Sequence, residues 1–335
     1  MKAIIPVAGA GTKLRPHTYT QPKALIPLAG KTVLSIIVDQ LVDAGLKDFV
    51  FIIGYLGDKI QDYVNQHYSH LNCQFVLQND RLGTGHAIEI TKNLVGDEEI
   101  LIVLGDTIAE YDVAEVVNAT HSVLCVKRVD DPQSFGVAEL EEGSNRIVKV
   151  VEKPSIPKSN LALVGIYKIK ETKLLFECLE AQQHLLKGAY ETFYLTDALE
   201  LMIKEGVIFH AVKVKHWFDC GKKENLLESN ATLLKKFGGN KEASNEYFNT
   251  VIIPPVFIAK GCIISNRVIG PNVAVGEFTA LKNVILKNSI IGAYSNLYEI
   301  VLSNSLIGND ADVKGVTRNL NIGDNTAVDL SGSSK

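Results

Sequence analysis

Several features that mark whole classes of protein are scarce or missing in this sequence of 335 residues. The 34 basic and 38 acidic residues give a net charge of −4, so the chain lacks the basic excess typical of nucleic-acid-binding proteins. No apolar run approaches the ~20 residues that span a bilayer, and no charged-then-apolar leader precedes the first apolar run. We therefore expect a cytoplasmic protein that binds neither nucleic acid nor membranes.

Cysteine is also sparse. The chain has five cysteines, an odd number, widely spaced and without any C-x-x-C pair. This pattern argues against a disulfide framework and against a cysteine zinc site. We expect buried thiols at Cys73, Cys125, Cys178, Cys220 and Cys262.

Two common nucleotide-binding patterns are absent. The dinucleotide pattern G-x-G-x-x-G begins at Gly9 and Gly11 but fails at its third position, which is Leu14. The Walker pattern G-x-x-x-x-G-K-[ST] does not occur anywhere in the chain. Any phosphate site at the N-terminus must therefore be of another kind.

A glycine-bearing loop nevertheless follows the first apolar run, residues 3–7, which is typical of a strand buried on both faces of a parallel sheet. Glycines in such a loop let successive backbone N–H groups approach a polyphosphate closely. Three basic side chains, Lys13, Arg15 and Lys23, follow within the same segment. Together these features predict a site for a nucleoside triphosphate.

Strand and helix patterns alternate from residue 1 to about residue 235, which predicts an α/β fold with a parallel or mixed sheet covered on both faces. With 46% apolar residues the chain can build a sizeable core, and its length suggests two domains. Strands are predicted at residues 49–53, 73–77, 99–104, 123–127, 137–141, 147–152, 161–169 and 207–214, and helices at residues 33–42, 59–68, 85–93, 113–119, 173–182, 196–205 and 223–236.

The period changes after a polar stretch that begins at residue 238. Aliphatic residues then recur every five or six positions, and residues 286–292 match residues 302–308 at a spacing of sixteen. Stacked turns that each point an aliphatic side chain inward give this period. The aliphatic positions are Ile258, Ile264, Ile269, Val275, Leu281, Leu286, Ile291, Leu297, Leu302, Ile307 and Val313.

This second pattern resembles the hexapeptide repeat of left-handed parallel β-helices. That fold also occurs in acyltransferases, whose chemistry normally needs a histidine base. All eight histidines of the chain precede this domain, so we expect it to serve structure or oligomer assembly. The predicted organisation is a domain at residues 1–237, a linker at 238–250 and a β-helix at 251–335.

Residues 8–18 and 22–27 follow the patterns A-G-x-G-T-[RK]-L-x-P-x-T and P-K-x-L-x-P, which resemble the signature of sugar-phosphate nucleotidyltransferases. The resemblance implies a Rossmann-like, mixed but mostly parallel sheet. It also assigns the triphosphate to the loop formed by Ala8, Gly9, Gly11 and Thr12. The catalytic roles would fall on Lys13, Arg15 and Lys23, with Lys13 standing where the family usually has arginine, which binds phosphate oxygens bidentately.

Residues 78–87 resemble the Q-x-x-x-L-G-T-[AG]-H-A segment with which uridylyltransferases of this family recognise uracil. The resemblance implies that Gln78, the backbone of Gly83 and Thr84 bind the nucleotide. A glycine-rich helix N-terminus is the structural alternative. We expect His86 to pack or cap and assign it no role in the chemistry.

Two aspartates are candidates for a Mg²⁺ site. Asp106 ends the buried strand 101–104, where a carboxylate can hold a metal ion beside a triphosphate. Asp219 lies in a Trp-Phe-Asp-Cys-Gly segment that resembles the W-x-D-x-G motif of the family. The resemblance implies that both bind one Mg²⁺, although a strand-terminal aspartate is more often a helix cap.

The sugar phosphate is assigned by resemblance to segments between these two aspartates. Gly136 lies in a Phe-Gly-Val segment, Glu152 and Lys153 in an E-K-P motif, and Asn160 precedes the strand 161–169. Thr196 and Asp197 could be no more than the N-cap of the next helix.

The resemblance implies a Mg²⁺-dependent enzyme that transfers a nucleotidyl group from UTP or dTTP to a hexose 1-phosphate. The acceptor would be glucose 1-phosphate or an N-acetylhexosamine 1-phosphate, the products an NDP-sugar and pyrophosphate, and the protein a homo-oligomer. Two alternatives stay open: a catalytically silent regulatory or scaffold homologue, for which Lys13 is an argument, and a bifunctional enzyme with an acyltransferase domain.

Overall fold

The computed structural model describes residues 1–185, 192–239 and 249–315. The chain divides into two compact units, residues 1–239 and 240–335. Most of the predicted linker, residues 240–248, lies outside the described residues. None of the described helices has the length and apolar character that crossing a bilayer requires.

The first unit is built around a nine-stranded sheet in the order β5-β4-β1-β6-β11-β8-β12-β10-β9. β1 pairs in parallel with β4 and β6, and β4 pairs in parallel with β5, whereas β11 runs antiparallel to β6 and β8. The mixed, Rossmann-like sheet agrees with the prediction. The strands are β1 (Lys2–Pro6), β4 (Asp48–Ile53), β5 (Asn72–Leu77), β6 (Ile100–Val103), β8 (Ser122–Arg128), β9 (Gly136–Leu140), β10 (Arg146–Glu152), β11 (Leu161–Ile169) and β12 (Phe209–Lys213).

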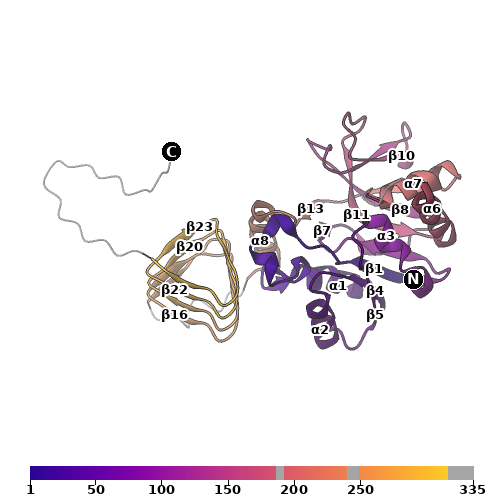
Figure 1. Cartoon of the computed structure of the whole chain (residues 1–335). Coiled ribbons are helices and arrows are strands. Elements are labelled where there is room, and N and C mark those ends of the chain that lie inside the picture. The colour runs from indigo at the N-terminus through magenta and orange to yellow at the C-terminus, as the bar shows by residue number, and fades with distance from the viewer. Residues whose placement is uncertain (186–191, 240–248, 316–335) are drawn as a thin grey trace. The chain divides into compact units, whose positions relative to one another are not determined.

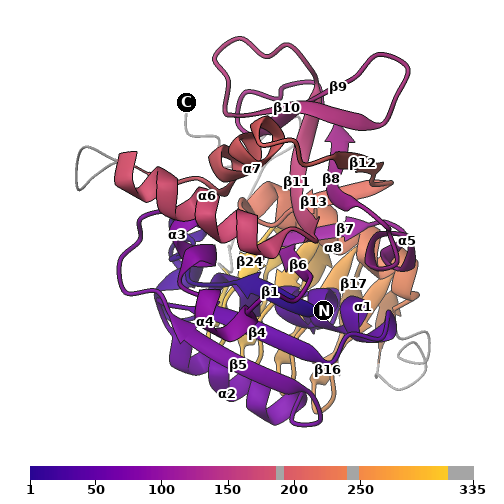
Figure 2. The ribbon, with the colours of Figure 1, turned by 90° about the vertical axis from the view of Figure 1, so that its right-hand side faces the viewer.

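Helices cover both faces of this sheet, with α3, α6 and α7 on one face and α2 on the other (Figure 2). The predicted helix 85–93 is two short helices instead, because Thr91 is buried and its hydroxyl donates to the carbonyl of Ile88 at 2.7 Å. The helices are α1 (Val33–Asp43), α2 (Gly57–His67), α3 (Thr84–Glu89), α4 (Lys92–Val95), α5 (Val113–Val117), α6 (Thr172–Leu185), α7 (Leu195–Lys204) and α8 (Lys223–Phe237), with 3₁₀ turns at Thr12–Leu14, His17–Tyr19 and Lys23–Leu25.

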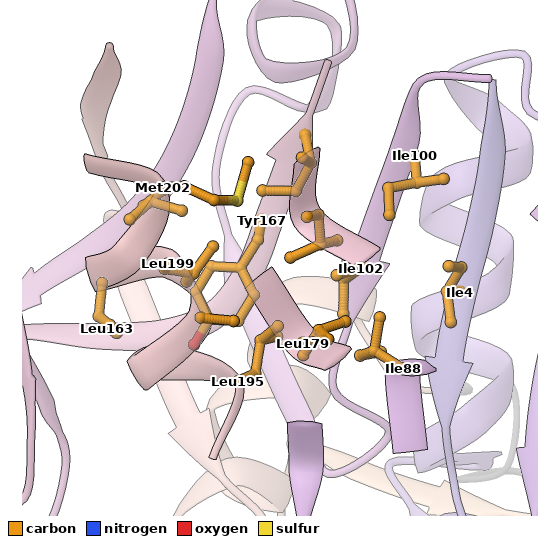
Figure 3. Close-up of a cluster of buried hydrophobic side chains, with 14 of the residues drawn as sticks. Ile4, Ile88, Ile100, Ile102, Leu163, Tyr167, Leu179, Leu195, Leu199 and Met202 are labelled. Atoms are coloured by element: carbon orange, nitrogen blue, oxygen red, sulfur yellow. The ribbon is translucent and has the colours of Figure 1, made fainter. Parts of the chain in front are cut away.

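One apolar cluster fixes α3, α6 and α7 to the sheet (Figure 3). Tyr167 of β11 lies in this cluster beside Leu195 and Leu199 of α7, and Ile88 of α3 lies near Ile102 of β6. Each fully buried aliphatic side chain stabilises the fold by about 1.5–3 kcal/mol. The cluster therefore holds the N-terminus of α3 and the N-terminus of α7 in fixed positions at the edge of the sheet.

Two short antiparallel pairs complete the first unit: β2 (Pro27–Leu28) with β3 (Lys31–Thr32), and β7 (Thr107–Glu110) with β13 (His216–Asp219). The strand at 216–219 was not among the predicted elements. Its partner lies about a hundred positions earlier in the chain, so no local pattern marks it. The pairing sets Asp219 opposite Thr107, the residue after Asp106.

The second unit is a left-handed parallel β-helix, as predicted, with strands of two or three residues stacked in three parallel sheets (Figure 1). Leu286 pairs with Leu302, which is the sixteen-residue repeat seen in the sequence. Ile269, Leu286 and Leu297 are buried in its core. The strands are β14 (Thr250–Ile252), β15 (Val256–Ile258), β16 (Ile263–Ser265), β17 (Arg267–Ile269), β18 (Val273–Val275), β19 (Ala280–Lys282), β20 (Ile285–Lys287), β21 (Ser289–Ile291), β22 (Asn296–Tyr298), β23 (Val301–Ser303), β24 (Leu306–Ile307) and β25 (Asp312–Lys314).

Candidate active site

The carboxyl ends of the four parallel strands β5, β4, β1 and β6 form one edge of the first unit's sheet. The chain passes from β1 to β4 on one side and later to β6 on the other, which makes this edge a topological switch point, where ligands bind in open α/β sheets. Two glycines, Gly54 and Gly105, allow the segments after β4 and β6 to approach the end of β1 closely. A Cβ at Gly54 would lie 2.9 Å from the Ala8 carbonyl oxygen, and one at Gly105 would lie 2.7 Å from that of Pro6.

A cavity of about 290 Å³ opens at this edge. Its walls come from the loop after β1, the 3₁₀ turn at residues 23–25, the segment after β5 and the loop after β6. Among the residues that line it are Ala8, Gly9, Lys23, Gln78, Gly83 and Asp106.

The segment after β5 has a backbone that requires glycine. Gly83 has φ +114° and ψ −175°, and a Cβ there would lie 2.3 Å from the carbonyl oxygen of Phe193. The backbone N–H of Gly85 donates to that carbonyl at 2.8 Å, and the N–H of Phe193 donates to the carbonyl of Leu82 at 2.7 Å. These bonds tie the cavity wall to the segment that leads into α7.

Asp106 stands in the loop after β6, where Lys23 Nζ lies 2.5 Å from its Oδ2 atom. The side chain of Lys23 is mostly buried, whereas that of Asp106 is 41% exposed, and both residues line the cavity. The backbone N–H of Cys220 donates to the carbonyl of Asp106 at 3.1 Å, so Asp219 directly precedes a residue bonded to Asp106. The side chain of Asp219 lies outside the described residues.

A second cavity, of about 280 Å³, shares Thr84, Leu104 and Asp106 with the first. Its far wall contains Glu152 and Lys153, which the sequence assigned to the sugar phosphate. The shared residues make the two cavities adjoining compartments of one cleft.

A polar network orders the wall of the second cavity. The hydroxyl of Thr196 donates to Glu152 Oε2 at 2.7 Å, and Lys153 Nζ lies 3.2 Å from Glu152 Oε1. Lys153 Nζ also stands 4.7 Å from the centre of the Tyr194 ring, within the range of a cation–π contact. Burial, and then the Glu152 carboxylate, raise the pKa of Tyr167 well above its ordinary value, so this hydroxyl stays protonated.

The family of the chain follows from comparison with known proteins. A family model described as nucleotidyl transferase matches residues 2–236. This chain belongs to the nucleotidyl transferase family. The match confirms the resemblance seen in the sequence and covers the unit that holds both cavities.

Three similar proteins illustrate the family. The chain is 37% identical over 263 residues to the bifunctional protein GlmU of Methanocaldococcus jannaschii, covering 78% of the chain and 61% of that protein. It is 31% identical to a glucose-1-phosphate thymidylyltransferase of Streptomyces antibioticus, covering 81% of the chain and 77% of that enzyme. A crystal structure of a UDP-glucose pyrophosphorylase complexed with UDP-glucose matches with a TM-score of 0.60 and 27% identity, covering 70% of the chain and 98% of that structure. The chain thus spans about three fifths of the length of the archaeal GlmU relatives that it matches.

Nucleotidyl transferases of this family generally use a divalent metal ion. Within residues 1–185, 192–239 and 249–315, no group of three or more His, Cys, Asp or Glu side chains is arranged so that it could hold a metal ion. Mg²⁺ does not need such a cage, because it usually binds one or two carboxylates and completes its octahedron with water and substrate phosphates. The exposed carboxylate of Asp106 in the shared part of the cleft fits that mode.

Several residues that the sequence assigned to the site lie outside the linings of both cavities. Lys13 and Arg15 are exposed, and the Arg15 guanidinium stands 5.0 Å from the Tyr19 ring centre. Gly11, with φ +59°, supports the loop by accepting a hydrogen bond from the Thr18 hydroxyl at 2.8 Å.

The remaining two of these residues are Thr12 and Asn160. Thr12 is an exposed residue that begins the first 3₁₀ turn. Asn160 lines a separate surface hollow beside Lys158 and Ser159, and its carbonyl accepts from the N–H of Val129 at 3.0 Å.

Other residues line the cleft without having been assigned to it. Arg81 borders the first cavity, and its guanidinium stands 5.7 Å from the Tyr55 ring centre. Trp217 borders the second and packs edge-on against Phe135. Trp217 is part of the W-x-D-x-G motif, and Arg81 is part of the base-recognition motif at residues 78–87. Both residues could therefore have been predicted as site residues from these motifs.

Proposed function

We propose that this chain is a sugar-1-phosphate nucleotidyltransferase that transfers a nucleotidyl group from UTP or dTTP to a hexose 1-phosphate. One observation carries the proposal. Two cavities of similar volume share Thr84, Leu104 and Asp106, so two substrates bound side by side would meet at the Asp106 carboxylate.

The first cavity is the site for the nucleoside triphosphate. The backbone of Gly9 has open space around it, so a polyphosphate can approach the loop without steric hindrance. Lys23 lines this cavity and supplies positive charge. Gln78 and Gly83 also line this cavity, where they would contact the base.

Lys13, Arg15, Gly11 and Thr12 form the outer part of the loop. We assign their charges and backbone groups to the β- and γ-phosphates, which extend out of the cavity toward solvent. In that role Lys13 acts as a point charge in place of the planar fork of arginine.

The second cavity is the site for the sugar 1-phosphate. Glu152, oriented by Thr196, would accept hydrogen bonds from the sugar hydroxyls, and Lys153 would contact the phosphate. Glycine at position 136 keeps Glu152 in place, because a Cβ there would lie only 3.1 Å from Glu152 Oε2. Asn160, in its separate hollow, would reach the sugar only after a local movement.

The chemistry is an in-line displacement that needs no nucleophile from the protein. A phosphate oxygen of the sugar 1-phosphate bonds to the α-phosphorus, and the bond from the α-phosphorus to the bridging oxygen breaks. Pyrophosphate leaves with the electron pair, and the NDP-sugar remains. Catalysis then rests on positioning and on charge stabilisation by Lys23. A Mg²⁺ held by Asp106 and Asp219 would offset the negative charge of the α-phosphate.

Glucose 1-phosphate and an N-acetylhexosamine 1-phosphate are the proposed acceptors. The similarity to a glucose-1-phosphate thymidylyltransferase and to a UDP-glucose pyrophosphorylase supports glucose 1-phosphate.

The test is a screen of five nucleoside triphosphates against several sugar 1-phosphates with Mg²⁺, read by pyrophosphate release. We expect release with UTP or dTTP, and a large loss in a Lys23→Met variant. A Lys204→Met variant, which changes an exposed lysine of α7, serves as the control. Absence of pyrophosphate release with every pair would contradict the proposal.

A catalytically silent homologue is the second candidate, and the exposure of Lys13 outside both cavity linings favours it. It predicts nucleotide binding without turnover, and turnover in a Lys13→Arg variant. The acyltransferase alternative is weaker, because residues 251–335 contain no histidine. Binding of acetyl-CoA to the full chain would revive it.

A further inference from the structure

The amide of Gln78 has a defined orientation in the first cavity. The side chain is buried, at 8% exposure, and its Nε2 atom lies 3.1 Å from the carbonyl oxygen of Gly83. A carbonyl oxygen only accepts hydrogen bonds, so the nitrogen of the amide, and not its oxygen, must lie on that side.

The second hydrogen of this amide points to His86. Nε2 of Gln78 lies 3.2 Å from Nδ1 of His86, on the first turns of α3. Because Nε2 is a donor, Nδ1 must present a lone pair. The network therefore assigns a neutral His86 with its hydrogen on Nε2.

Gln78 then has one group left to offer a ligand. Both of its amide hydrogens are engaged, and no group in the described part of the chain donates to Oε1. Gln78 lines the cavity, whereas His86 is not part of that lining. Oε1 of this cavity-lining side chain is therefore left as a hydrogen-bond acceptor, and the histidine that holds the amide is not part of the lining.

We propose that His86 is a positioning residue that selects the base of the donor nucleotide by holding the Gln78 carbonyl toward it. Uracil and thymine carry an N3–H donor that matches this acceptor. Cytosine carries a lone pair at N3, which would face the oxygen and be repelled. The inference rests on the proposed function, because it places the base of the triphosphate beside Gln78.

His86 is needed because the contact with Gly83 is a single neutral hydrogen bond. Such a bond contributes only about 1 kcal/mol, and the second bond to His86 adds a similar amount against rotation of the amide. Loss of the His86 acceptor would leave the Gly83 carbonyl as the one remaining restraint on the amide, so a larger fraction of molecules would have the amide nitrogen toward the base. We expect the preference for UTP over CTP to fall by about 3- to 10-fold.

The test compares the dissociation constants of UTP and CTP, measured by titration calorimetry. His86→Leu removes the acceptor, and His86→Asn keeps one, because the asparagine carbonyl oxygen takes about the place of Nδ1. We expect the CTP/UTP ratio of dissociation constants to fall in His86→Leu and to return toward the wild-type ratio in His86→Asn.

An unchanged ratio in His86→Leu, or a ratio in His86→Asn as low as that in His86→Leu, would overturn the inference. Equal binding of UTP and CTP to the wild-type chain would overturn it as well. Pyrophosphate release by the wild-type chain is measured separately and tests the proposed function, so the two failures are distinguishable. The melting temperatures of both variants show whether a changed ratio comes from misfolding.

Discussion

Gly83 is a position in the candidate active site where the structure predicts a large effect of a single methyl group. Gly83→Ala adds a Cβ 2.3 Å from the carbonyl oxygen of Phe193, in a backbone region with φ +114° and ψ −175°. That region costs a residue other than glycine about 1–3 kcal/mol. Relief of the clash would also break one or two backbone hydrogen bonds to Phe193, each worth about 1 kcal/mol. The sum is a loss of about 2–5 kcal/mol in the free energy of unfolding.

Two other glycines separate these contributions. Gly143→Ala places a methyl group in open space at φ +72°, so it carries only the backbone cost of about 1–2 kcal/mol. Gly9→Ala has open space and no positive φ, so its stability should change by less than about 0.5 kcal/mol. At about 2–4 °C per kcal/mol, Gly83→Ala should melt at least about 4 °C below the wild type.

The assay is thermal unfolding of the three variants followed by the Michaelis constant for UTP below the melting transition. We expect the order of melting temperatures to be Gly9→Ala, then Gly143→Ala, then Gly83→Ala, from highest to lowest. The Michaelis constant for UTP should rise in Gly83→Ala and in Gly9→Ala, because both glycines line the first cavity, but not in Gly143→Ala. A Gly83→Ala variant that melts together with Gly143→Ala would refute the steric reasoning.

Three further predictions follow from other parts of the structure. Thr196→Val removes the hydroxyl that orients Glu152 through a charge-assisted hydrogen bond, which contributes about 1.5–3 kcal/mol. We therefore expect kcat/KM for the sugar phosphate to fall at least tenfold while the Michaelis constant for UTP is unchanged. A variant in which only the Michaelis constant for UTP rises would contradict this role. Arg267 is buried in the β-helix, and no described group accepts a hydrogen bond from its three guanidinium nitrogens. Arg267→Met should therefore raise the free energy of unfolding by about 1–3 kcal/mol, measured by thermal unfolding, whereas Lys282→Met at an exposed position should not. Destabilisation by Arg267→Met would show that the guanidinium has hydrogen-bond partners. Burial raises the pKa of the Cys73 thiol to about 11. At pH 8.5 this thiol should therefore react with iodoacetamide on the order of 100-fold more slowly than free cysteine. Alkylation of Cys73 in the folded protein at the rate of free cysteine would contradict the raised pKa.

The fold was largely predictable from local patterns. The strand at residues 161–169 matches its predicted bounds. The sixteen-residue repeat corresponds to one turn of the β-helix, in which Leu286 pairs with Leu302. Local patterns failed where a distant partner decides the structure, as for β13 at His216–Asp219. They also failed at Thr91, whose buried hydroxyl divides the predicted helix at 85–93.

The candidate site was predictable where a motif coincides with a strand end. The positions of Gln78 and Asp106 after β5 and β6 bring both to one cavity, because parallel strands share a carboxyl edge. The orientation of the Gln78 amide was not predictable, because it depends on atoms of Gly83 and His86 that only the folded chain places. The same holds for Thr196, which the sequence could not separate from a helix cap.

The most direct test of the central claim follows the α-phosphorus of the donor. UTP labelled at the α-phosphate is incubated with the chain, Mg²⁺ and glucose 1-phosphate or N-acetylglucosamine 1-phosphate, and the products are separated; dTTP is tested in parallel. The account predicts that the label enters an NDP-sugar while unlabelled pyrophosphate is released, and that Asp106→Asn abolishes both. Label that stays in the triphosphate under all these conditions, or that leaves as nucleoside monophosphate without sugar, would contradict it.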